Sequence, residues 1–422
     1  MKKIQVAIIG AGNRGGLFGE LMQERKDEFE IAAVCDIEPK QLVKCKLRMH
    51  LTDEQLFSDE KTFFEKKRGD LMVVATYDRD HVRQCIAALK LGYDVLLEKP
   101  ISDSREELRE LIAVQKETGR KVIVCHELRY GAGYVKAKEL LQEGVIGQLL
   151  TIDAMERVVY WHQAQAYVRI QSAYNELTHP TILAKCSHDL DLIQSYAGAP
   201  CETVSSIGGL SYFRESQAPK DSTEYCLDCP HVDTCPYSAK KVYIERWHAL
   251  GEPDFIWPFN KVSLKVPTTE EDLYEGLRTT YFGKCVFHCH NEAYEHVVDH
   301  QLVQMQFANG VQAVLKMVFA STSGRRINFF GTLGEILLDE RTDTIEVRLY
   351  GKEPEIIPLN TLVERGHNHG GGDNILVSRL YGILTDQTPV LTSLTESAES
   401  HLMGISAEES RLNGGVLVKV HQ

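Results

Sequence analysis

Short apolar runs alternate with amphipathic stretches over the first 126 residues of the chain. The apolar runs are rich in β-branched residues and predict strands at residues 6–9, 31–35, 71–75, 95–97 and 122–125, with a weaker strand near Leu56. The stretches between them predict helices at residues 39–46, 80–91 and 104–118, and another through Phe63 and Phe64. Regular alternation of strand and helix predicts a parallel, doubly wound α/β sheet whose strands are covered on both faces.

The pattern changes beyond residue 126, where helices are predicted at 134–142 and 181–197 and a strand at 149–154. Longer alternating runs follow, and the run 298–319 breaks at Asn309-Gly310, a dipeptide typical of a tight hairpin. Shorter strands are predicted around Asn328, around Ile336 and at 344–349. Residues 127–422 are therefore predicted to form an α+β domain with a large open, predominantly antiparallel sheet and helices on one face. Within it, residues 219–280 are rich in proline, cysteine and charge and predict an inserted loop region with one helix at 239–247.

A glycine-rich loop, Gly10-Ala11-Gly12-Asn13-Arg14-Gly15, directly follows the first apolar run. In a strand–loop–helix unit, Gly10 makes the tight turn, Gly12 lets the backbone approach a pyrophosphate and Gly15 lets the helix pack on the strand. Asp36 ends the second apolar run, about twenty residues further on, where a carboxylate accepts both hydroxyls of an adenosine ribose and repels a 2′-phosphate. The first 126 residues are therefore predicted to form a Rossmann domain that binds NAD, with NADP disfavoured.

Composition narrows the choice of partners. The 422-residue chain carries a formal net charge of −13, which argues against nucleic acid or an anionic membrane surface as a partner. No apolar run is long enough to span a bilayer. Eleven cysteines without a recognisable secretion signal favour a reducing compartment, so we expect a cytoplasmic protein.

Glu98-Lys99-Pro100 follows the fifth predicted strand. The carboxyl ends of the strands in a doubly wound sheet face the ligand crevice, so Lys99 is expected to project toward the nicotinamide. Its ammonium group can bind a substrate hydroxyl, stabilise an alkoxide and transfer a proton. The alternative interpretation is a solvated lysine at the end of a strand.

Several motifs together resemble the Gfo/Idh/MocA family of oxidoreductases. The motifs are the glycine loop, Val74-Ala75-Thr76 with His81, Gly92 to Pro100, Arg129-Tyr130, Gly144 to Gly147, His188 to Leu192, Gly331 to Gly334 and His369 to Asp373. The resemblance weakens only in residues 219–280. It implies an NAD(P)-binding N-terminal domain, a C-terminal substrate domain, action on sugars, polyols or their derivatives, and assembly as a homodimer or homotetramer through the open sheet. It also suggests a cis Lys99–Pro100 bond.

The resemblance assigns roles to individual residues. It implies that Lys99 and His188 are catalytic, with His188 as general base or as a ligand of the reacting hydroxyl. Lys185 lies three residues before His188 on the same helical face and is expected to bind substrate. Many relatives have an aspartate at the position of Ala184, so the substrate or the proton route is expected to differ here. The residues expected at the cofactor are Gly10, Gly12, Asn13, Arg14, Gly15, Asp36, Thr76, His81, Glu98, Lys99 and Arg129.

Two further clusters are candidates for the substrate cleft. Residues 156–169 include Tyr160-Trp161-His162 and Tyr167-Val168-Arg169, and His162 and Arg169 suit a polyhydroxylated or carboxylated ligand. The alternative is a hydrophobic loop packed on the domain. In His367-Asn368-His369, the resemblance implies that His369 contacts substrate, whereas helix capping, for which Asp373 is suited, is the alternative.

Cys226, Cys229 and Cys235 lie close together in the inserted segment. Such spacing favours a metal site over a disulfide in a reducing compartment, and we consider structural zinc first, an iron–sulfur cluster second and free thiols third. The sequence leaves the fourth ligand open among His231, Cys201, Cys285, Cys289, His288 and His290.

Three functions agree with these residues. The first is an NAD-dependent oxidoreductase that acts on a secondary hydroxyl of a sugar, polyol or sugar derivative. The second is an NAD-dependent glycoside hydrolase that works by transient oxidation and elimination, and the change to Ala184 and the aromatic residues around Trp161 favour it. The third is a non-catalytic, NAD-responsive regulator, against which Lys99 and His188 argue.

Overall fold

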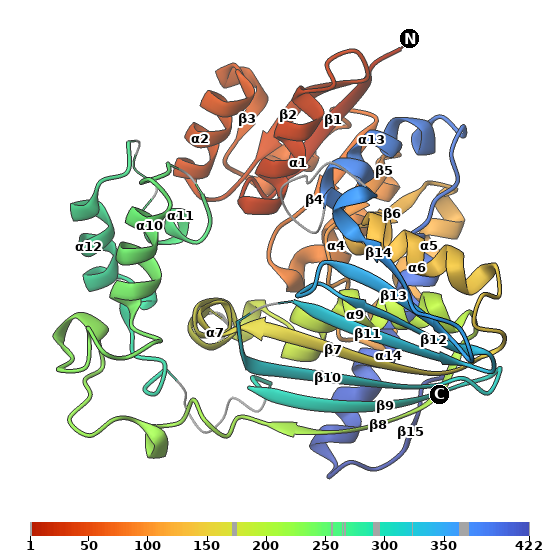
Figure 1. Cartoon of the computed structure of the whole chain (residues 1–422). Helices are drawn as coiled ribbons and strands as arrows, with labels where there is room; N and C mark the ends of the chain where they lie inside the picture. The colour runs from red at the N-terminus through yellow and green to blue at the C-terminus, as the bar shows by residue number, and fades with distance from the viewer. Residues whose placement is uncertain are drawn as a thin grey trace.

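The computed structural model describes residues 2–170, 175–254, 256–263, 265, 267–289, 296–322, 324–362 and 371–421. Two sheets organise these residues, one above the other in Figure 1. The six-stranded sheet is parallel throughout, as predicted for the N-terminal part of the chain. Its order is β3 (Leu56–Phe57), β2 (Phe29–Cys35), β1 (Ile4–Ile9), β4 (Leu71–Val74), β5 (Asp94–Leu97) and β6 (Val122–Val124).

Helices cover both faces of this parallel sheet. They are α1 (Asn13–Gln23), α2 (Pro39–Met49), α3 (Glu60–Phe64), α4 (His81–Lys90) and α5 (Arg105–Thr118). Two helices from the C-terminal end of the chain join them, because α13 (Gly372–Leu384) packs on one face and α14 (Leu394–Leu412) reaches the other. Local sequence fixes the ends of α5: Ser104 accepts a hydrogen bond from the backbone of Glu107, and Gly119 takes the left-handed conformation.

The nine-stranded sheet is mixed and mostly antiparallel, as predicted. Its order is β14 (Glu355–Pro358), β13 (Thr344–Leu349), β12 (Gly334–Asp339), β11 (Arg325–Gly331), β7 (Leu149–Val159), β10 (Gln312–Ser321), β9 (His300–Phe307), β8 (Cys201–Gly209) and β15 (Val418–Lys419). Among the described strands of this sheet, only β7 and β10 pair in parallel. The predicted hairpin joins β9 to β10, with Gly310 at φ +88°.

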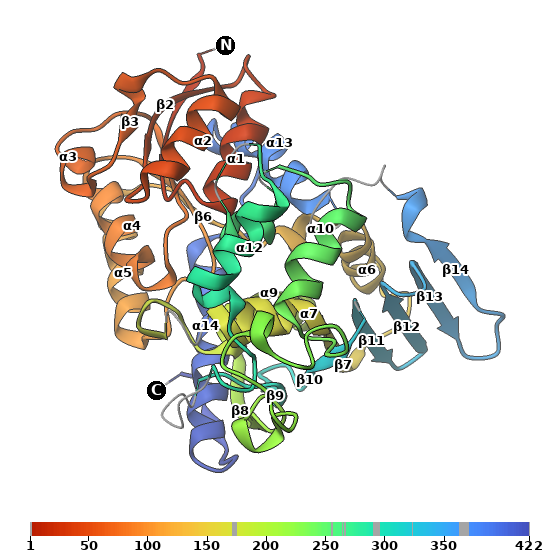
Figure 2. The same cartoon turned by 90° about the vertical axis from the view of Figure 1, so that its left-hand side faces the viewer.

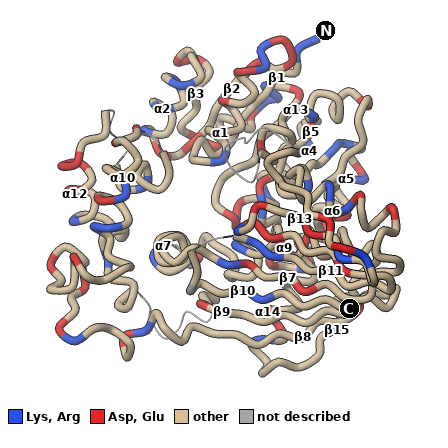
Figure 3. Tube along the Cα trace, viewed as in Figure 1, with Lys and Arg blue, Asp and Glu red and all other residues tan. Residues whose placement is uncertain are grey.

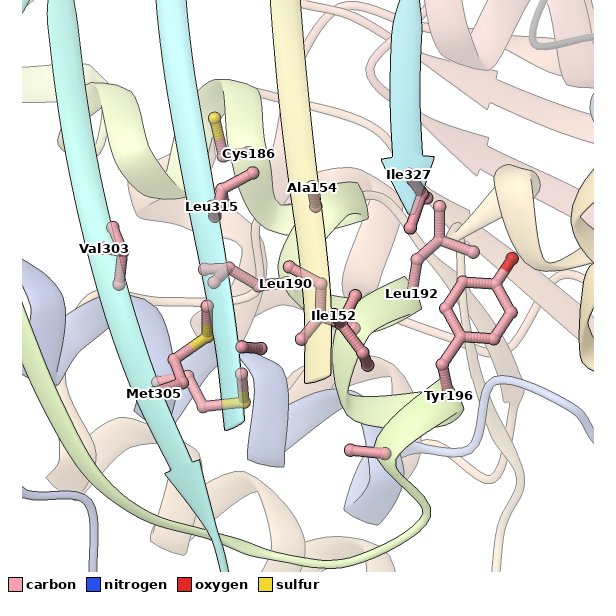
Figure 4. Close-up of a cluster of buried hydrophobic side chains, with 14 of the residues drawn as sticks. Ile152, Ala154, Cys186, Leu190, Leu192, Tyr196, Val303, Met305, Leu315 and Ile327 are labelled. Carbon is pink, nitrogen blue, oxygen red and sulfur yellow. The ribbon is translucent and has the colours of Figure 1, made fainter. Parts of the chain in front are cut away.

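One face of the nine-stranded sheet packs against α9 (Thr181–Ala197), α14 and α6 (Ala132–Gln142). Figure 4 shows this core, in which Leu190 and Tyr196 of α9 meet Ile152 of β7, Leu315 of β10 and their neighbours. The residues alternate between buried and accessible along β9 and β12, so the opposite face of the sheet is accessible. The helix predicted at residues 181–197 is confirmed to the residue.

The inserted segment differs from its prediction as a loop region with one helix. A continuous helical stretch follows Ser238, includes the π-helical turn Lys241–Glu245 and ends in α10 (Arg246–Ala249). Two more helices follow, α11 (Phe259–Val262) and α12 (Glu270–Thr279), and Thr269 and Asp272 form a reciprocal cap at the start of α12. Phe213, Tyr243 and Leu273 belong to a separate buried cluster that includes these helices. The insertion therefore has its own core, and Figure 2, in which the left-hand side of Figure 1 faces the viewer, shows α10 and α12 in front.

Charge is distributed along the whole chain. Figure 3 shows acidic and basic residues interspersed along the trace around both sheets. No helix among the described residues is long and apolar enough to cross a membrane.

Candidate active site

The glycine loop turns directly from β1 into α1. Gly10 has φ +87°, and a Cβ at this position would lie 2.4 Å from the carbonyl oxygen of Ala75. A Cβ on Gly15 would lie 2.0 Å from the carbonyl oxygen of Gly10, so a side chain there would push α1 away from β1. At Gly12 a Cβ would meet no atom within 4 Å. The loop is thus closed at Gly10 and Gly15 and open at Gly12, where a phosphate group can approach the backbone.

Asp36 follows β2 and lies against this loop. Its carboxylate accepts hydrogen bonds from the backbone N–H groups of Ala11, at 2.6 Å, and Glu38, at 2.8 Å. Burial raises the pKa of Asp36, and the two hydrogen bonds oppose that shift. The carboxylate therefore lies at the carboxyl end of β2, beside the loop that precedes α1.

The insertion also reaches the glycine loop. The amide of Asn260 in α11 donates a hydrogen bond to the Asn13 side-chain oxygen at 2.6 Å. The next residue, Lys261, has a lowered pKa because it is desolvated and lies near Lys44, while Asp36 partly offsets both effects. Helix α11 therefore packs over the glycine loop and brings a second lysine toward Asp36.

Arg14 lies at the centre of a buried acidic cluster rather than in the open loop. Its guanidinium group pairs with Glu98, with Glu127 and, at 2.6 Å, with Asp373 of α13. Three distant parts of the sequence therefore meet at one side chain of α1. We call Arg14, Glu98, Glu127 and Asp373 the Arg14 cluster.

The Arg14 cluster places three carboxylates around one cation. Glu98, Glu127 and Asp373 are all at least 96% buried, with exposures of 4%, 1% and 0%. Burial raises the pKa of Glu127 well above its usual value, although Arg14 opposes the shift. Burial alone would lower the pKa of Arg14, but the carboxylates outweigh it and raise that pKa. Arg14 therefore supplies the positive charge that stabilises these three buried carboxylates.

Lys99 lies next to the cluster, at the carboxyl end of β5. The Lys99–Pro100 peptide bond is cis, which confirms that hypothesis. Lys99 Nζ donates a hydrogen bond to the carbonyl oxygen of Ala184 at 2.9 Å, so the lysine reaches the helix α9 that carries His188. Burial lowers the pKa of Lys99, and the nearby Glu98 and Glu127 oppose this shift. Such a lysine can change protonation state more readily than a solvated one.

His188 connects α9 to the Arg14 cluster. Its Nε2 atom lies 3.6 Å from Oε2 of Glu127, and its ring packs edge-on against the ring of His126. Burial lowers the pKa of His126 to about 3, so that imidazole is neutral near pH 7. Behind these rings, the buried Asp191 lies 3.7 Å from Arg129, and burial raises the pKa of Asp191 to about 6. The catalytic candidates Lys99 and His188 therefore both lie near the carboxylate of Glu127.

A second charged group lies between α9 and the nine-stranded sheet. Lys185 pairs with Glu156 of β7 at 3.2 Å, and Arg325 of β11 binds the same carboxylate at 2.6 Å. Arg325 also binds Asp189, at 2.8 Å. Lys185 is thus held on the sheet side of α9, one residue from the carbonyl group that binds Lys99.

Aromatic rings surround His162. It follows β7 in the short helix α7 (Tyr160–His162), and its ring lies against those of Trp161, Tyr167 and Trp257. Burial and the nearby Lys185 lower the pKa of His162 to about 3. A neutral imidazole among aromatic faces is suited to a polyhydroxylated ligand.

The other residues expected at the site lie in varied surroundings. Thr76 donates a hydrogen bond to Gln84, and His81 contacts the carbonyl oxygen of Pro100 at 2.7 Å, beside Lys99. Arg129 donates to the carbonyl oxygen of Leu391. Arg169, by contrast, is completely buried and donates to Sγ of Cys226 in the insertion. His369 lies outside the described residues.

Sequence reasoning missed the two carboxylates that complete the Arg14 cluster. Glu127 follows β6 at the same edge of the sheet as Glu98. Its position just after an apolar strand could therefore have indicated that it lies near Glu98. Asp373 was considered only as a helix cap, because nothing local connects it with a residue 359 positions earlier.

Two family models match the chain. Residues 4–126 match the NAD-binding Rossmann fold of the oxidoreductase family, and residues 138–370 match the C-terminal alpha/beta domain of that family. The chain belongs to the Gfo/Idh/MocA oxidoreductase family.

Curated relatives agree with this family. The chain is 24% identical to YteT of Bacillus subtilis, a protein named as an oxidoreductase, over 86% of this chain and 84% of that protein. It is 28% identical to an inositol 2-dehydrogenase of Rubrobacter xylanophilus, over 35% of this chain and 42% of the dehydrogenase. A 2,7-anhydro-N-acetylneuraminate hydratase of Mediterraneibacter gnavus is 28% identical over 50% of this chain and 53% of the hydratase.

Solved structures share the fold of this Gfo/Idh/MocA protein. A levoglucosan dehydrogenase in complex with NADH and levoglucosan superposes with a TM-score of 0.69 at 15% identity, covering all of both chains. An Agrobacterium radiobacter oxidoreductase in complex with NAD+, L-tartaric acid and magnesium gives 0.68 at 15% identity, with 99% of each chain covered.

We expect Arg14→Gln to lower the free energy of unfolding by about 3–5 kcal/mol near neutral pH, because three buried carboxylates lose their cation. Removing Arg14 takes away the charge that opposes the raised pKa of Glu127, so that pKa rises further in the folded chain. The folded variant then binds more protons than the unfolded one, so its stability deficit grows as the pH rises and shrinks as it falls. Urea unfolding at several values between about pH 5 and pH 8 measures this difference.

Arg83→Gln is the matched control. Arg83 also binds two carboxylates, Glu60 and Asp80, but its side chain is 57% exposed. Its loss should cost less than about 1 kcal/mol. Two outcomes would contradict the role assigned to the Arg14 cluster. One is an equal loss of unfolding free energy in the two variants, and the other is a loss in Arg14→Gln that does not change with pH.

Substitutions in the glycine loop should separate cofactor binding from folding. Gly12→Ala is expected to keep the free energy of unfolding within about 1 kcal/mol, because a Cβ there meets open space. It should weaken NAD binding about tenfold or more, because the methyl group takes the place of an approaching phosphate. Gly15→Ala should instead destabilise the fold by about 2 kcal/mol or more, since its Cβ overlaps a carbonyl oxygen. Calorimetric titration with NAD and chemical unfolding measure the two effects, and unchanged NAD binding by folded Gly12→Ala would argue against this placement.

Proposed function

We propose that this protein reversibly oxidises a secondary hydroxyl group of a sugar, polyol or sugar derivative, with NAD as the hydride acceptor. One arrangement carries the proposal: Lys99 binds the helix that holds His188, and Glu127 serves both residues at the carboxyl edge of the parallel sheet. The glycine loop lies at the same edge. The site therefore combines a place for a dinucleotide with groups that can handle a proton.

The residues beside the glycine loop fit NAD. Gly12 leaves room above the start of α1, and α1 begins without a side-chain cap, so its backbone N–H groups can bind phosphate. Asp36 is placed to bind the adenosine ribose. When bound, NAD supplies the hydride acceptor at the reacting carbon.

Lys99 and His188 divide the remaining chemistry. The Lys99 ammonium group binds the reacting oxygen and stabilises its developing negative charge. His188 accepts the hydroxyl proton, and Glu127 stabilises the imidazolium that forms. Because Glu127 also pairs with Arg14, its carboxylate stays oriented during this transfer.

The surroundings of His188 favour a polyhydroxylated substrate. His162 brings aromatic faces to the sheet side of α9, and Lys185 brings a positive charge. The relatives named as inositol and levoglucosan dehydrogenases act on molecules of this class by name, and they support the choice.

The accessible face of the nine-stranded sheet bears exposed Ile207 and Phe330, and we propose it as the contact between copies in a homodimer or homotetramer.

A second candidate is redox-neutral chemistry, in which transient oxidation permits elimination and addition of water or cleavage of a glycoside. Ala184 favours this candidate, because it stands where many relatives have an aspartate and offers only its carbonyl group to Lys99. The relative named as a hydratase supports it as well.

Lys99→Met and His188→Gln should each lower kcat by about 10²-fold or more, because each removes a group that handles the proton or the oxyanion. NAD binding should stay within a few-fold of the unchanged protein. Lys121→Met is the control: Lys121 Nζ donates to the carbonyl oxygen of Ile383 at 2.9 Å, but it precedes β6 at the opposite edge of the sheet.

A panel of free sugars and polyols and a panel of nitrophenyl glycosides should be tested with all three variants. Net formation of NADH from a free sugar supports the dehydrogenase. Product release without net NADH supports the redox-neutral candidate. Full activity in both Lys99→Met and His188→Gln would exclude this site as the catalytic centre.

Asp36→Ser should shift the cofactor preference. We expect about tenfold weaker NAD binding and about tenfold stronger NADP binding, because the variant loses the ribose ligand and the repulsion of a 2′-phosphate. Lys44 and Lys261 would then face that phosphate. Calorimetric titration with both nucleotides measures the shift, and a preference for NADP in the unchanged protein would contradict the role of Asp36.

A further inference from the structure

The insertion brings four cysteines to one pocket. Cys226, Cys229 and Cys235 come from two consecutive turns after residue 224, and Cys285 comes from the segment that follows α12. A bridge between Tyr225 and Lys284 places these distant segments side by side. The four cysteines line the same pocket, together with apolar side chains that include Val232 and Phe287.

Other candidate ligands are engaged elsewhere. His231 also lines the pocket, but its Nε2 atom lies 2.7 Å from the carbonyl oxygen of Lys220, and His288 Nε2 lies 3.0 Å from the Ser222 hydroxyl. The thiol of Cys289 donates to the carbonyl oxygen of Cys285 and does not line the pocket. Cys201 lies in β8, and His290 is outside the described residues. Cys285 is therefore the remaining cysteine candidate that lines the pocket with the other three thiols.

Arg169 provides an independent indication of an anionic occupant. Its side chain is fully buried, and it donates to the carbonyl oxygens of Lys284 and Tyr237 and to Sγ of Cys226 at 3.6 Å. Its Nη1 atom has no hydrogen-bond partner, and no carboxylate among the described residues forms an ion pair with it. A buried cation without an opposite charge is strongly unfavourable. Thiolates bound to a metal centre would supply that charge beside Cys226.

The spacing of the thiols distinguishes between metal centres. Tetrahedral zinc with bonds of about 2.3 Å brings its four sulfur atoms to about 3.8 Å from one another. The Cys226 and Cys285 thiols lie within hydrogen-bonding distance of each other, but in the part of the chain that the structure describes no three of the four sulfur atoms lie within 4.8 Å of one another. An iron–sulfur cluster with two irons binds a close pair of thiolates at each iron and keeps the two pairs apart across its sulfides, which fits this spacing.

We propose that Cys226, Cys229, Cys235 and Cys285 bind an iron–sulfur cluster, with Arg169 as its buried counter-charge. Each thiol releases its proton and binds iron as a thiolate, while the iron and the sulfide come from outside the chain. The cluster ties the segment around Cys226 to the segment after α12, and so fixes the insertion. This site does not depend on the proposed hydride chemistry.

The test uses the full chain without a histidine tag, purified without oxygen. Iron, acid-labile sulfide and zinc are measured per chain, together with the visible absorption of thiolate-bound iron. We expect iron and sulfide in comparable amounts. Cys226→Ser and Cys285→Ser should each reduce the iron at least about tenfold, and Arg169→Gln should weaken retention of iron when a chelator is present.

Cys289→Ser is the matched control, because this thiol lies near the pocket but does not line it. It should retain iron and sulfide. Circular dichroism and NAD binding identify variants that have lost their fold, and anaerobic addition of iron and sulfide to the unchanged chain tests the site without any substitution.

Three results would overturn the proposal. Zinc in place of iron would replace the cluster with a zinc site. Neither metal before and after anaerobic reconstitution would leave four free thiols. Loss of iron in Cys289→Ser but not in Cys285→Ser would give a different set of ligands.

Discussion

One guanidinium group holds the carboxyl edge of the parallel sheet together. Arg14 extends from the helix of the glycine loop and pairs with carboxylates from the end of β5, the turn after β6 and the start of α13. Each carboxylate is too deeply buried to be stabilised by water, so its position depends on this cation. Because Glu127 also faces His188, the orientation of a proposed catalytic imidazole depends on the loop proposed to bind the cofactor.

Desolvation acts throughout this site with opposite effects on acids and bases. It raises the pKa of Glu127 and of Asp191, and it lowers the pKa of Lys99 and of His162. The two carboxyl groups and Lys99, which are ionised in water at neutral pH, are thereby moved toward conditions where they can exchange protons, whereas His162 is kept neutral. The pairing of Glu156 with Arg325 shows the complementary case, in which a close cation keeps a buried carboxylate ionised.

Local sequence was enough to predict the parallel sheet, helix α9 and the hairpin between β9 and β10. The spacing of apolar residues, the capping residues and the turn residues specify such elements directly. The Arg14 cluster could not be predicted in this way, since its partners lie up to 359 positions apart and are joined only by the fold. The additional helices of the insertion were not predicted, for a related reason. Its apolar residues are dispersed among proline and cysteine, yet the cap formed by Thr269 and Asp272 was a readable signal for α12. Arg169 shows most clearly what residue type alone cannot predict. Its guanidinium group suggested an accessible substrate-binding residue, whereas the fold buries it.

The contact between Asn260 and Asn13 ties the insertion to the glycine loop. Helix α11 and the start of α1 therefore cannot move apart without breaking this hydrogen bond. A conformational change in the insertion, which has its own core, would thus reach the loop of the N-terminal domain directly.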